Sequence, residues 1–154
     1  MKTYLYTDGS CYHKDQLGTW GAVVVTPSLK KMLWGVCYAT TISRMELVPM
    51  VEGMRWILKE IYHNVPGANL CIVSDSQYTV KVASGLDSTE KNQDLWAAFN
   101  HMASKFKVSY EWRSRNSCVP LEICDSCAGA LRTYVKRDLY KGMTEMPLHF
   151  DHES

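Results

Sequence analysis

The sequence predicts an α/β domain built on a mixed five-stranded sheet, with three antiparallel strands followed by parallel strands and helices on both faces. Three observations support this fold class. The first 40 residues contain three β-type runs with short links, which is typical of an antiparallel meander. A later run, residues 69–74, is almost wholly apolar, as a strand buried on both faces of a parallel sheet is. Elsewhere, apolar residues recur at steps of three and four, the period of amphipathic helices.

The first predicted strand, residues 4–10, contains a carboxylate. Aromatic and threonine residues dominate this run, and it ends at the turn formers Gly9 and Ser10. A strand rich enough in Tyr and Leu to be central cannot hold the charge of Asp8 without a partner or a metal ion. Asp8 is therefore the first candidate metal ligand. The next two strands are predicted over residues 20–25 and 32–38.

A helical stripe starts after the third strand and includes Leu47, Met54 and Ile61. Ser43 and Glu46 match a Ser-x-x-Glu capping box, so we expect the helix to begin at Ser43. Pro49 lies past the first turn and is expected to bend or weaken the helix near Met45, because proline has no N–H to donate.

The second half of the chain continues with alternating elements. Asp75 follows the buried strand at its carboxyl end, where open α/β sheets bind ligands. We expect a short helix after Asp75, a helix over 93–104, a half-buried strand over 107–112 and a final helix over 121–137. The domain is expected to span residues 1–140, and residues 141–154 are expected to form a flexible C-terminal tail.

Composition restricts the class of protein. The 154 residues are 46% hydrophobic and 21% charged, which fits one globular domain and excludes a largely disordered chain. The formal net charge is only +1, so any nucleic-acid affinity must come from a local basic patch. The chain shows no signal sequence and no apolar run long enough to span a membrane. We expect a soluble, cytoplasmic protein.

The six cysteines are expected to be reduced thiols rather than a disulfide framework. A zinc site is the alternative, built from Cys118, Cys124 and Cys127 together with His149 and His152. The distance in sequence from Cys127 to His149 is longer than in the usual zinc patterns, which disfavours this alternative.

Four acidic residues occupy suggestive places, and each has a local alternative. Asp8 could be a turn residue, Glu46 a capping-box partner and Asp75 the N-cap of a short helix. Asp125 could be a first-turn acid favoured by the helix dipole. Spacing alone leaves both interpretations open.

The segments around these acids resemble, in order and approximate spacing, four signature segments of type 1 ribonuclease H. The resemblance covers about residues 3–137. The matching segments are Tyr6-Thr7-Asp8-Gly9-Ser10, Arg44-Met45-Glu46-Leu47, Ser74-Asp75-Ser76-Gln77-Tyr78-Thr79-Val80 and Cys124-Asp125.

This resemblance implies a ribonuclease H-like fold and an endonuclease that cuts the RNA strand of RNA–DNA hybrids, leaving 5′-phosphate and 3′-hydroxyl ends. Asp8, Glu46, Asp75 and Asp125 would hold two Mg²⁺ ions, for which Mn²⁺ can substitute. Hard divalent cations prefer oxygen ligands, and two such ions stabilise both the attacking and the leaving oxygen of a phosphodiester displacement.

The resemblance also implies contacts to the substrate. Gly9, Ser10 and Gln77 would lie along the RNA strand, while Thr41 and Arg44 would contact backbone phosphates. The loop after the last predicted strand adds three further candidates, which are Arg113, Arg115 and Asn116.

Three departures from the family pattern concern the residues that are expected to contact the substrate. Ile42-Ser43 stands where two asparagines often occur, and Asn116 or a neighbour stands where a histidine assists proton transfer or product release. Residues 86–92 are too short and too acidic for the basic handle helix of some bacterial members. We therefore expect modest, salt-dependent affinity for the hybrid. We expect a monomer, and an accessory nucleic-acid-binding partner stays open.

Two other functions compete with the hybrid-cutting enzyme. One is a module of the same fold that binds hybrids or duplexes with little hydrolysis. The other is a DNA nuclease or recombination-type member of the wider superfamily. Retention of four carboxylates favours an enzyme, because four clustered negative charges repel a polyanion unless cations neutralise them.

Overall fold

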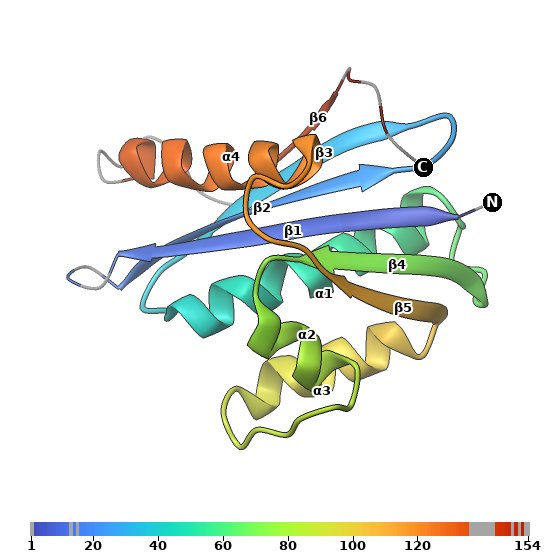
Figure 1. Ribbon diagram of the computed structural model, residues 1–154, viewed down its shortest axis with the longest axis horizontal. Coiled ribbons are helices and arrows are strands. Elements are labelled where there is room, and N and C mark those ends of the chain that lie inside the picture. The colour runs from blue at the N-terminus through green and yellow to red at the C-terminus, as the bar shows by residue number, and fades with distance from the viewer. Residues whose placement is uncertain are drawn as a thin grey trace.

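The computed structural model describes residues 2–12, 14, 16–135, 144–148, 150 and 152, which build one mixed β-sheet covered by helices on both faces (Figure 1). The strands are β1 (Thr3–Tyr12), β2 (Leu17–Val25), β3 (Lys30–Cys37), β4 (Ala68–Ser74), β5 (Phe106–Trp112) and β6 (Thr144–Pro147). The helices are α1 (Ile42–Glu60), α2 (Gln77–Ala83), α3 (Gln93–Ala103) and α4 (Val119–Val135).

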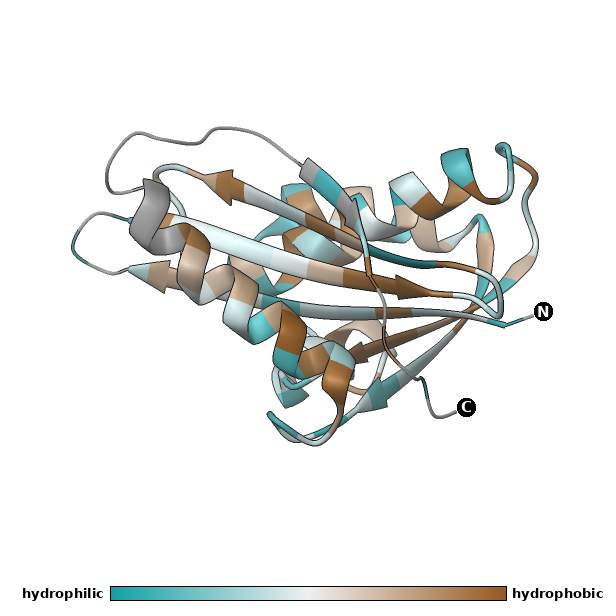
Figure 2. Cartoon of the chain, turned by 90° about the horizontal axis from the view of Figure 1, so that it is seen from above, coloured by the Kyte–Doolittle hydropathy of each residue, from teal (hydrophilic) through white to brown (hydrophobic). Residues whose placement is uncertain are grey.

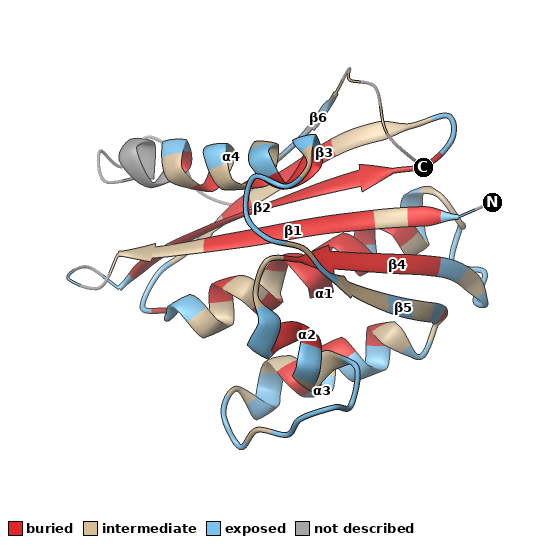
Figure 3. Ribbon diagram, viewed as in Figure 1, coloured by how far each residue is buried: buried red, intermediate tan, exposed pale blue. Residues whose placement is uncertain are grey.

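The sheet has the order β5-β4-β1-β2-β3-β6. β1, β2 and β3 pair antiparallel, and β4 pairs parallel with both β1 and β5. This arrangement confirms the predicted mixed five-stranded sheet. The central strands β1, β2 and β4 are mostly buried, as Figure 3 shows.

A sixth strand adds to the edge that β3 would otherwise expose. β6 pairs antiparallel with β3 over Lys31 to Trp34. Glu145 of β6 accepts a hydrogen bond from Trp56 Nε1 at 2.5 Å and lies 3.6 Å from Lys31 Nζ. The sequence pattern placed these residues in a flexible tail, which is wrong for residues 144–147, because pairing with an open strand edge orders a segment whose own period is weak. Residues 136–143, which include the predicted boundary at 140, lie outside the described residues.

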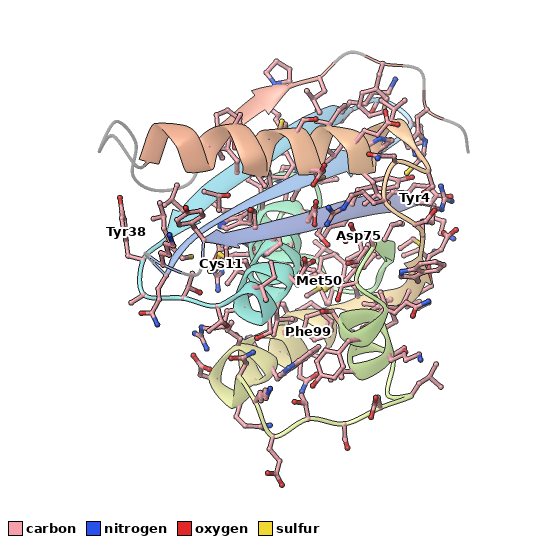
Figure 4. All side chains as sticks on the ribbon, turned by 60° about the vertical axis from the view of Figure 1, so that its left-hand side comes forward. Tyr4, Cys11, Tyr38, Met50, Asp75 and Phe99 are labelled. Carbon is pink, nitrogen blue, oxygen red and sulfur yellow. The ribbon has the colours of Figure 1, made fainter. Side chains whose placement is uncertain are left out.

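The helices divide the core into two layers. Figure 1 shows α1, α2 and α3 on one face of the sheet and α4 on the other. Met50 of α1 and Phe99 of α3, both labelled in Figure 4, belong to the larger core. Tyr6, Leu121 and Cys124 belong to the smaller core under α4. Figure 2 looks down onto α4, which lies across the strands and carries both hydrophobic and hydrophilic residues. Successive side chains of β1 alternate between the two layers.

Helix α1 begins at Ile42, one residue before the start that the capping-box pattern predicts. Its N-cap is Thr41, whose side-chain oxygen accepts from the Arg44 N–H at 3.4 Å. The predicted capping box of Ser43 and Glu46 is therefore wrong, because the N-cap is Thr41, which accepts from the Arg44 N–H at the start of the helix. The helix continues without interruption through Pro49 to Glu60. Of the described helices, none is long and apolar enough to cross a membrane.

Candidate metal centre

Asp8 lies inside the central strand β1, and only 1% of it is exposed. Its Oδ1 accepts a hydrogen bond from the Gly9 N–H at 2.9 Å. The register between β1 and β4 ends at the pair Thr7 and Ser74, so the sheet opens beside Asp8 where β4 gives way to a loop. The carboxyl end of a parallel strand therefore faces the buried acid, which is the usual place for ligands in such sheets.

Two glycines let helices from both faces approach Asp8. A Cβ at Gly9 would overlap the backbone carbonyl of Met45 in α1. Gly21 pairs with Asp8 across the β1–β2 ladder, and a Cβ there would lie 3.0 Å from the Cys124 carbonyl oxygen of α4. Met45 and Cys124 each precede one of the predicted acids. The absence of a side chain at both glycines thus allows Glu46 and Asp125 to come near Asp8.

Three of the predicted acids gather into one group. Asp8, Glu46 and Asp75 each offer an oxygen, and these oxygens all lie within 4.8 Å of one another. Asp75 lies where β4 ends, as labelled in Figure 4, and its backbone carbonyl accepts from Trp112 Nε1 at 2.9 Å. Glu46 is half-buried as a residue, but its Oε2 is buried without a hydrogen-bond partner among the described residues. A buried carboxylate oxygen without a partner is costly unless a ligand from outside the chain satisfies it.

Asp125, the fourth predicted acid, lies beside this group. It is half-buried in α4, and its proximity contributes, after burial and the charge of Asp75, to the raised pKa of the Asp8 carboxyl. Arg115 links it to the cluster, because its Nε lies 3.2 Å from Asp75 Oδ2 and 3.9 Å from Asp125 Oδ1. The structure therefore brings all four acids into one neighbourhood, with three of them in mutual reach.

Burial and mutual repulsion oppose ionisation of the cluster. Burial, followed by the charge of Asp75, raises the pKa of Asp8 to about 7. Burial, followed by the charges of Asp8 and Asp75, raises the pKa of Glu46 to about 9. A cation bound among these oxygens would favour their ionised forms, so cation binding and proton release are coupled at this site.

The arginines predicted to contact substrate are all ion-paired. Arg44 Nη1 and Nη2 donate to the two oxygens of Asp94 at 2.9 and 2.8 Å. Arg113 Nε donates to Glu111 Oε1 at 2.7 Å, and Arg115 pairs with the acidic cluster. None of the three therefore stands as a free basic group in this structure.

The remaining substrate candidates lie within a few positions of the acids or of Arg115 in the chain, and they have different structural roles. Ser10 is half-buried in β1, and Thr41 caps α1. Gln77 is exposed as the first residue of α2, directly after Ser76, which caps that helix in place of Asp75. Asn116 is exposed with a φ of 64°, a left-handed conformation that asparagine tolerates. Gly9 lies against α1, where any side chain would overlap the Met45 carbonyl.

Sequence reasoning missed Gly21 and Trp112 as supports of the site. The signal for Gly21 was its place inside a β-branched run, where glycine often marks close approach of another backbone. Nothing local identified Trp112, because its hydrogen bond to Asp75 depends on the pairing of β4 with β5.

The zinc alternative gains no support from the described residues. All six cysteines are free, and the metal-binding group found in the described part of the chain contains carboxylates only. His152 instead bonds the Tyr6 hydroxyl at 2.7 Å, while His149 lies outside the described residues.

Comparison with known proteins agrees with this geometry. The chain is 33% identical over 136 residues to a ribonuclease H of Hahella chejuensis, covering 79% of this chain and 86% of that protein. It is 30% identical over 121 residues to a ribonuclease H of Pseudomonas entomophila, covering 70% of this chain and 77% of that protein.

Solved structures share the fold at lower identity. The N-terminal RNase H domain of a Mycobacterium tuberculosis protein matches with a TM-score of 0.71 at 21% identity, covering 84% of this chain and 98% of that one. RNase H1 of Halobacterium salinarum matches with a TM-score of 0.67 at 16% identity, covering 86% and 99%. The RNase H family model matches residues 1–130, and with this match over most of its length the chain belongs to the RNase H family.

Proposed function

We propose that this protein is a metal-dependent endonuclease that hydrolyses the RNA strand of RNA–DNA hybrids and leaves 5′-phosphate and 3′-hydroxyl ends. The observation that carries the proposal is the group of oxygens from Asp8, Glu46 and Asp75 within 4.8 Å of one another. Membership of the RNase H family and the relatives named ribonuclease H support it further.

The donor set fits a hard divalent cation. Its oxygens are carboxylates, which Mg²⁺ and Mn²⁺ prefer, and the buried Glu46 Oε2 has no partner among the described residues that a cation would have to displace. Asp8, Glu46, Asp75 and Asp125 would hold the ions. Two such ions, when bound, activate a water and stabilise the leaving oxygen of an in-line phosphodiester displacement.

The chain's own residues position this chemistry. The Gly9 N–H holds Asp8 Oδ1, and the Trp112 indole holds the backbone of Asp75, so two of the ligands sit on the rigid sheet. Glu46 and Asp125 come from helices on opposite faces. A site assembled from the sheet and both helical layers keeps its geometry without the substrate, which is what an electrostatically preorganised site requires.

The proposed substrate side includes the exposed Thr41, Gln77 and Asn116 and the half-buried Ser10. Ser10, Thr41, Gln77 and Asn116 offer hydroxyl and amide groups, which suit the 2′-hydroxyls and phosphates of an RNA strand. Arg44, Arg113 and Arg115 would have to exchange a carboxylate for a phosphate to bind it. Because each exchange replaces one ion pair by another, we propose modest affinity for the hybrid. We propose that the protein acts as a monomer, whose affinity an accessory nucleic-acid-binding partner could increase.

Cleavage of a labelled RNA–DNA hybrid, compared with double-stranded RNA and DNA, tests the proposal. We expect cutting of the hybrid alone, only with Mg²⁺ or Mn²⁺, and loss of cutting in Asp8→Asn and Asp75→Asn. Asp87→Asn is the matched control, because Asp87 is exposed in the loop between α2 and α3, and it should cut as the unchanged protein does.

Two outcomes would replace the proposal. Hybrid binding without metal-dependent cutting would indicate the binding module. The ion pairs of the three arginines do not favour that function, because none of these side chains is a free basic group in this structure. Equal rates on the hybrid and on double-stranded DNA would indicate a DNA nuclease.

A further inference from the structure

Arg115 is the cation nearest to the carboxylate cluster among the described ion pairs. Its Nε donates to Asp75 Oδ2 at 3.2 Å and lies 3.9 Å from Asp125 Oδ1. Asp75 belongs to the group of oxygens that would hold a metal ion, and its side chain is 10% exposed, whereas the Arg115 side chain is 60% exposed. The arginine therefore approaches the cluster from its solvent side.

The loop that carries Arg115 is fixed on one side of it. The Arg113 N–H donates to the Ser74 carbonyl at 3.1 Å, and Trp112 Nε1 donates to the Asp75 carbonyl at 2.9 Å. Both bonds attach the start of the loop to the end of β4 through backbone atoms. The contact of Arg115 with the cluster is made by its side chain alone, so the side chain can leave while the loop keeps its attachment.

A guanidinium and a divalent cation cannot share Asp75 Oδ2 without repelling each other. Like charges a few ångströms apart destabilise each other strongly where water is partly excluded. Binding of a metal ion through Asp75 Oδ2 would therefore displace Arg115 from that oxygen.

From these contacts we infer that Arg115 is a built-in counter-ion of the metal-free centre, which divalent metal displaces, so that metal binding releases the guanidinium for a phosphate of the substrate. This inference rests on the proposed metal-dependent function. Arg115 acts through Asp75 and Asp125 and is a positioning residue: it holds the two carboxylates in place before the ion arrives and lowers the apparent affinity for the ion by competing with it.

Titration of the full chain with Mg²⁺ alone, in the absence of nucleic acid, tests the competition. Arg115→Ala should bind Mg²⁺ roughly two- to fivefold more tightly than the unchanged protein, the factor that corresponds to the free energy of one exposed ion pair. Arg115→Lys keeps the charge but not the planar fork, and its affinity should lie between the two. Asp75→Asn should weaken the same binding event, which identifies the site.

Arg55→Ala is the matched control for loss of an exposed, ion-paired arginine. Arg55 pairs with Glu52 on α1, and its side chain is 54% exposed, close to the value for Arg115. Its removal should leave Mg²⁺ affinity unchanged. Equal or weaker binding by Arg115→Ala would overturn the inference, and so would the absence of Mg²⁺ binding in the unchanged protein.

Thermal unfolding separates a displaced counter-ion from a permanent ion pair. In EDTA, Arg115→Ala should unfold at a lower temperature than the unchanged protein, because Asp75 and Asp125 lose their cation. At saturating Mg²⁺ this difference should close, since Arg115 has already left the carboxylates. A difference that persists in Mg²⁺ would show a structural ion pair and overturn the inference.

These measurements are independent of cleavage. If Arg115→Ala tightens Mg²⁺ binding but no variant cuts the hybrid, only the proposed nuclease function fails. If the unchanged protein cuts the hybrid, but Arg115→Ala has the same Mg²⁺ affinity and the same unfolding temperature in EDTA as the unchanged protein, only the inference fails.

Discussion

Arg44 and Glu46 stand two positions apart in the first turns of α1, yet their electrostatic surroundings are opposite. Arg44 makes two hydrogen bonds to Asp94, and this pair lowers the pKa of Asp94 to about 2. Glu46 faces two other acids, has a buried oxygen without a partner among the described residues, and has its pKa raised to about 9. The Arg44 contact is complete, because its charge is paired within the chain. The Glu46 contact is incomplete, because a buried carboxylate oxygen has no partner among the described residues.

The difference separates a structural contact from a chemical one. Arg44 and Asp94 connect the beginnings of α1 and α3 and need nothing from outside. The carboxylates around Asp8 destabilise one another until a cation joins them, and perturbed acids of this kind are typical of functional sites. The largest effects of substitution on activity should therefore fall on the incomplete contact, and loss of the complete contact should change the stability of the fold only slightly.

Asp8→Asn should give the largest effect. We expect hybrid cleavage to fall by about 10³-fold or more, because the central metal ligand is lost and metal ions contribute several kcal/mol to such a transition state. In EDTA near pH 8 the same variant should unfold at a higher temperature, since a buried acid that repels Asp75 becomes neutral. Cleavage rates and thermal unfolding in EDTA measure the two effects. Loss of activity together with lower stability in EDTA would mean that Asp8 is a structural residue.

The stability of the metal-free protein should fall as pH rises. The folded-state pKa values of Asp8 and Glu46 are raised to about 7 and about 9, so the folded chain keeps protons that the unfolded chain releases above about pH 4. Their stabilising contribution is complete below that pH and is lost as pH rises through the folded values, by up to about 1.4 kcal/mol per pH unit for each group. Urea unfolding in EDTA at about pH 5, 7 and 9 measures it.

Saturating Mg²⁺ should reverse this trend, because the ion favours the ionised carboxylates. The Asp8→Asn, Glu46→Gln double variant is the control and should show a flatter pH dependence in EDTA. An unchanged slope in that variant would place the responsible groups elsewhere.

Gly9→Ala tests the approach of α1 to Asp8. The added Cβ would overlap the Met45 carbonyl, so we expect a loss of about 1–3 kcal/mol in the free energy of unfolding, measured in urea. Gly129→Ala in α4 is the matched control, because a Cβ there meets no atom within 4 Å. It should be neutral or stabilise by about 0.5–1 kcal/mol, the usual gain in a helix interior. Equal stability of the two variants would argue against the close contact.

Arg44→Ala should have the smallest effect. The pair with Asp94 is exposed, so we expect only a slight drop in the unfolding temperature, which high salt removes. Asp94→Ala should behave alike, and the double variant should lose no more than either single one. Salt-independent losses would mean that the pair is part of the packed core rather than a surface contact.

Much of the fold was predictable because its signals are local. The run around Asp8, the apolar strand before Asp75 and the stripe of α1 each show the period of their own element, and the structure contains each of them. Local pattern failed where a neighbour decided the outcome. Residues 144–147 became a strand through pairing with β3, and the start of α1 depended on Thr41 rather than on Ser43 and Glu46.

The sequence by itself determined which elements form and which acids they carry, because burial and hydrogen bonding impose their period on neighbouring residues. Tertiary structure alone decided how these acids meet. Gly9 and Gly21 set the approach of two helices, the end of β4 opens the sheet beside Asp8, and Arg115 bridges Asp75 and Asp125. Such contacts join residues that are far apart in the chain, so they leave no periodic signal in the sequence. Only the packing of the folded chain brings the separate carboxylates together into one centre.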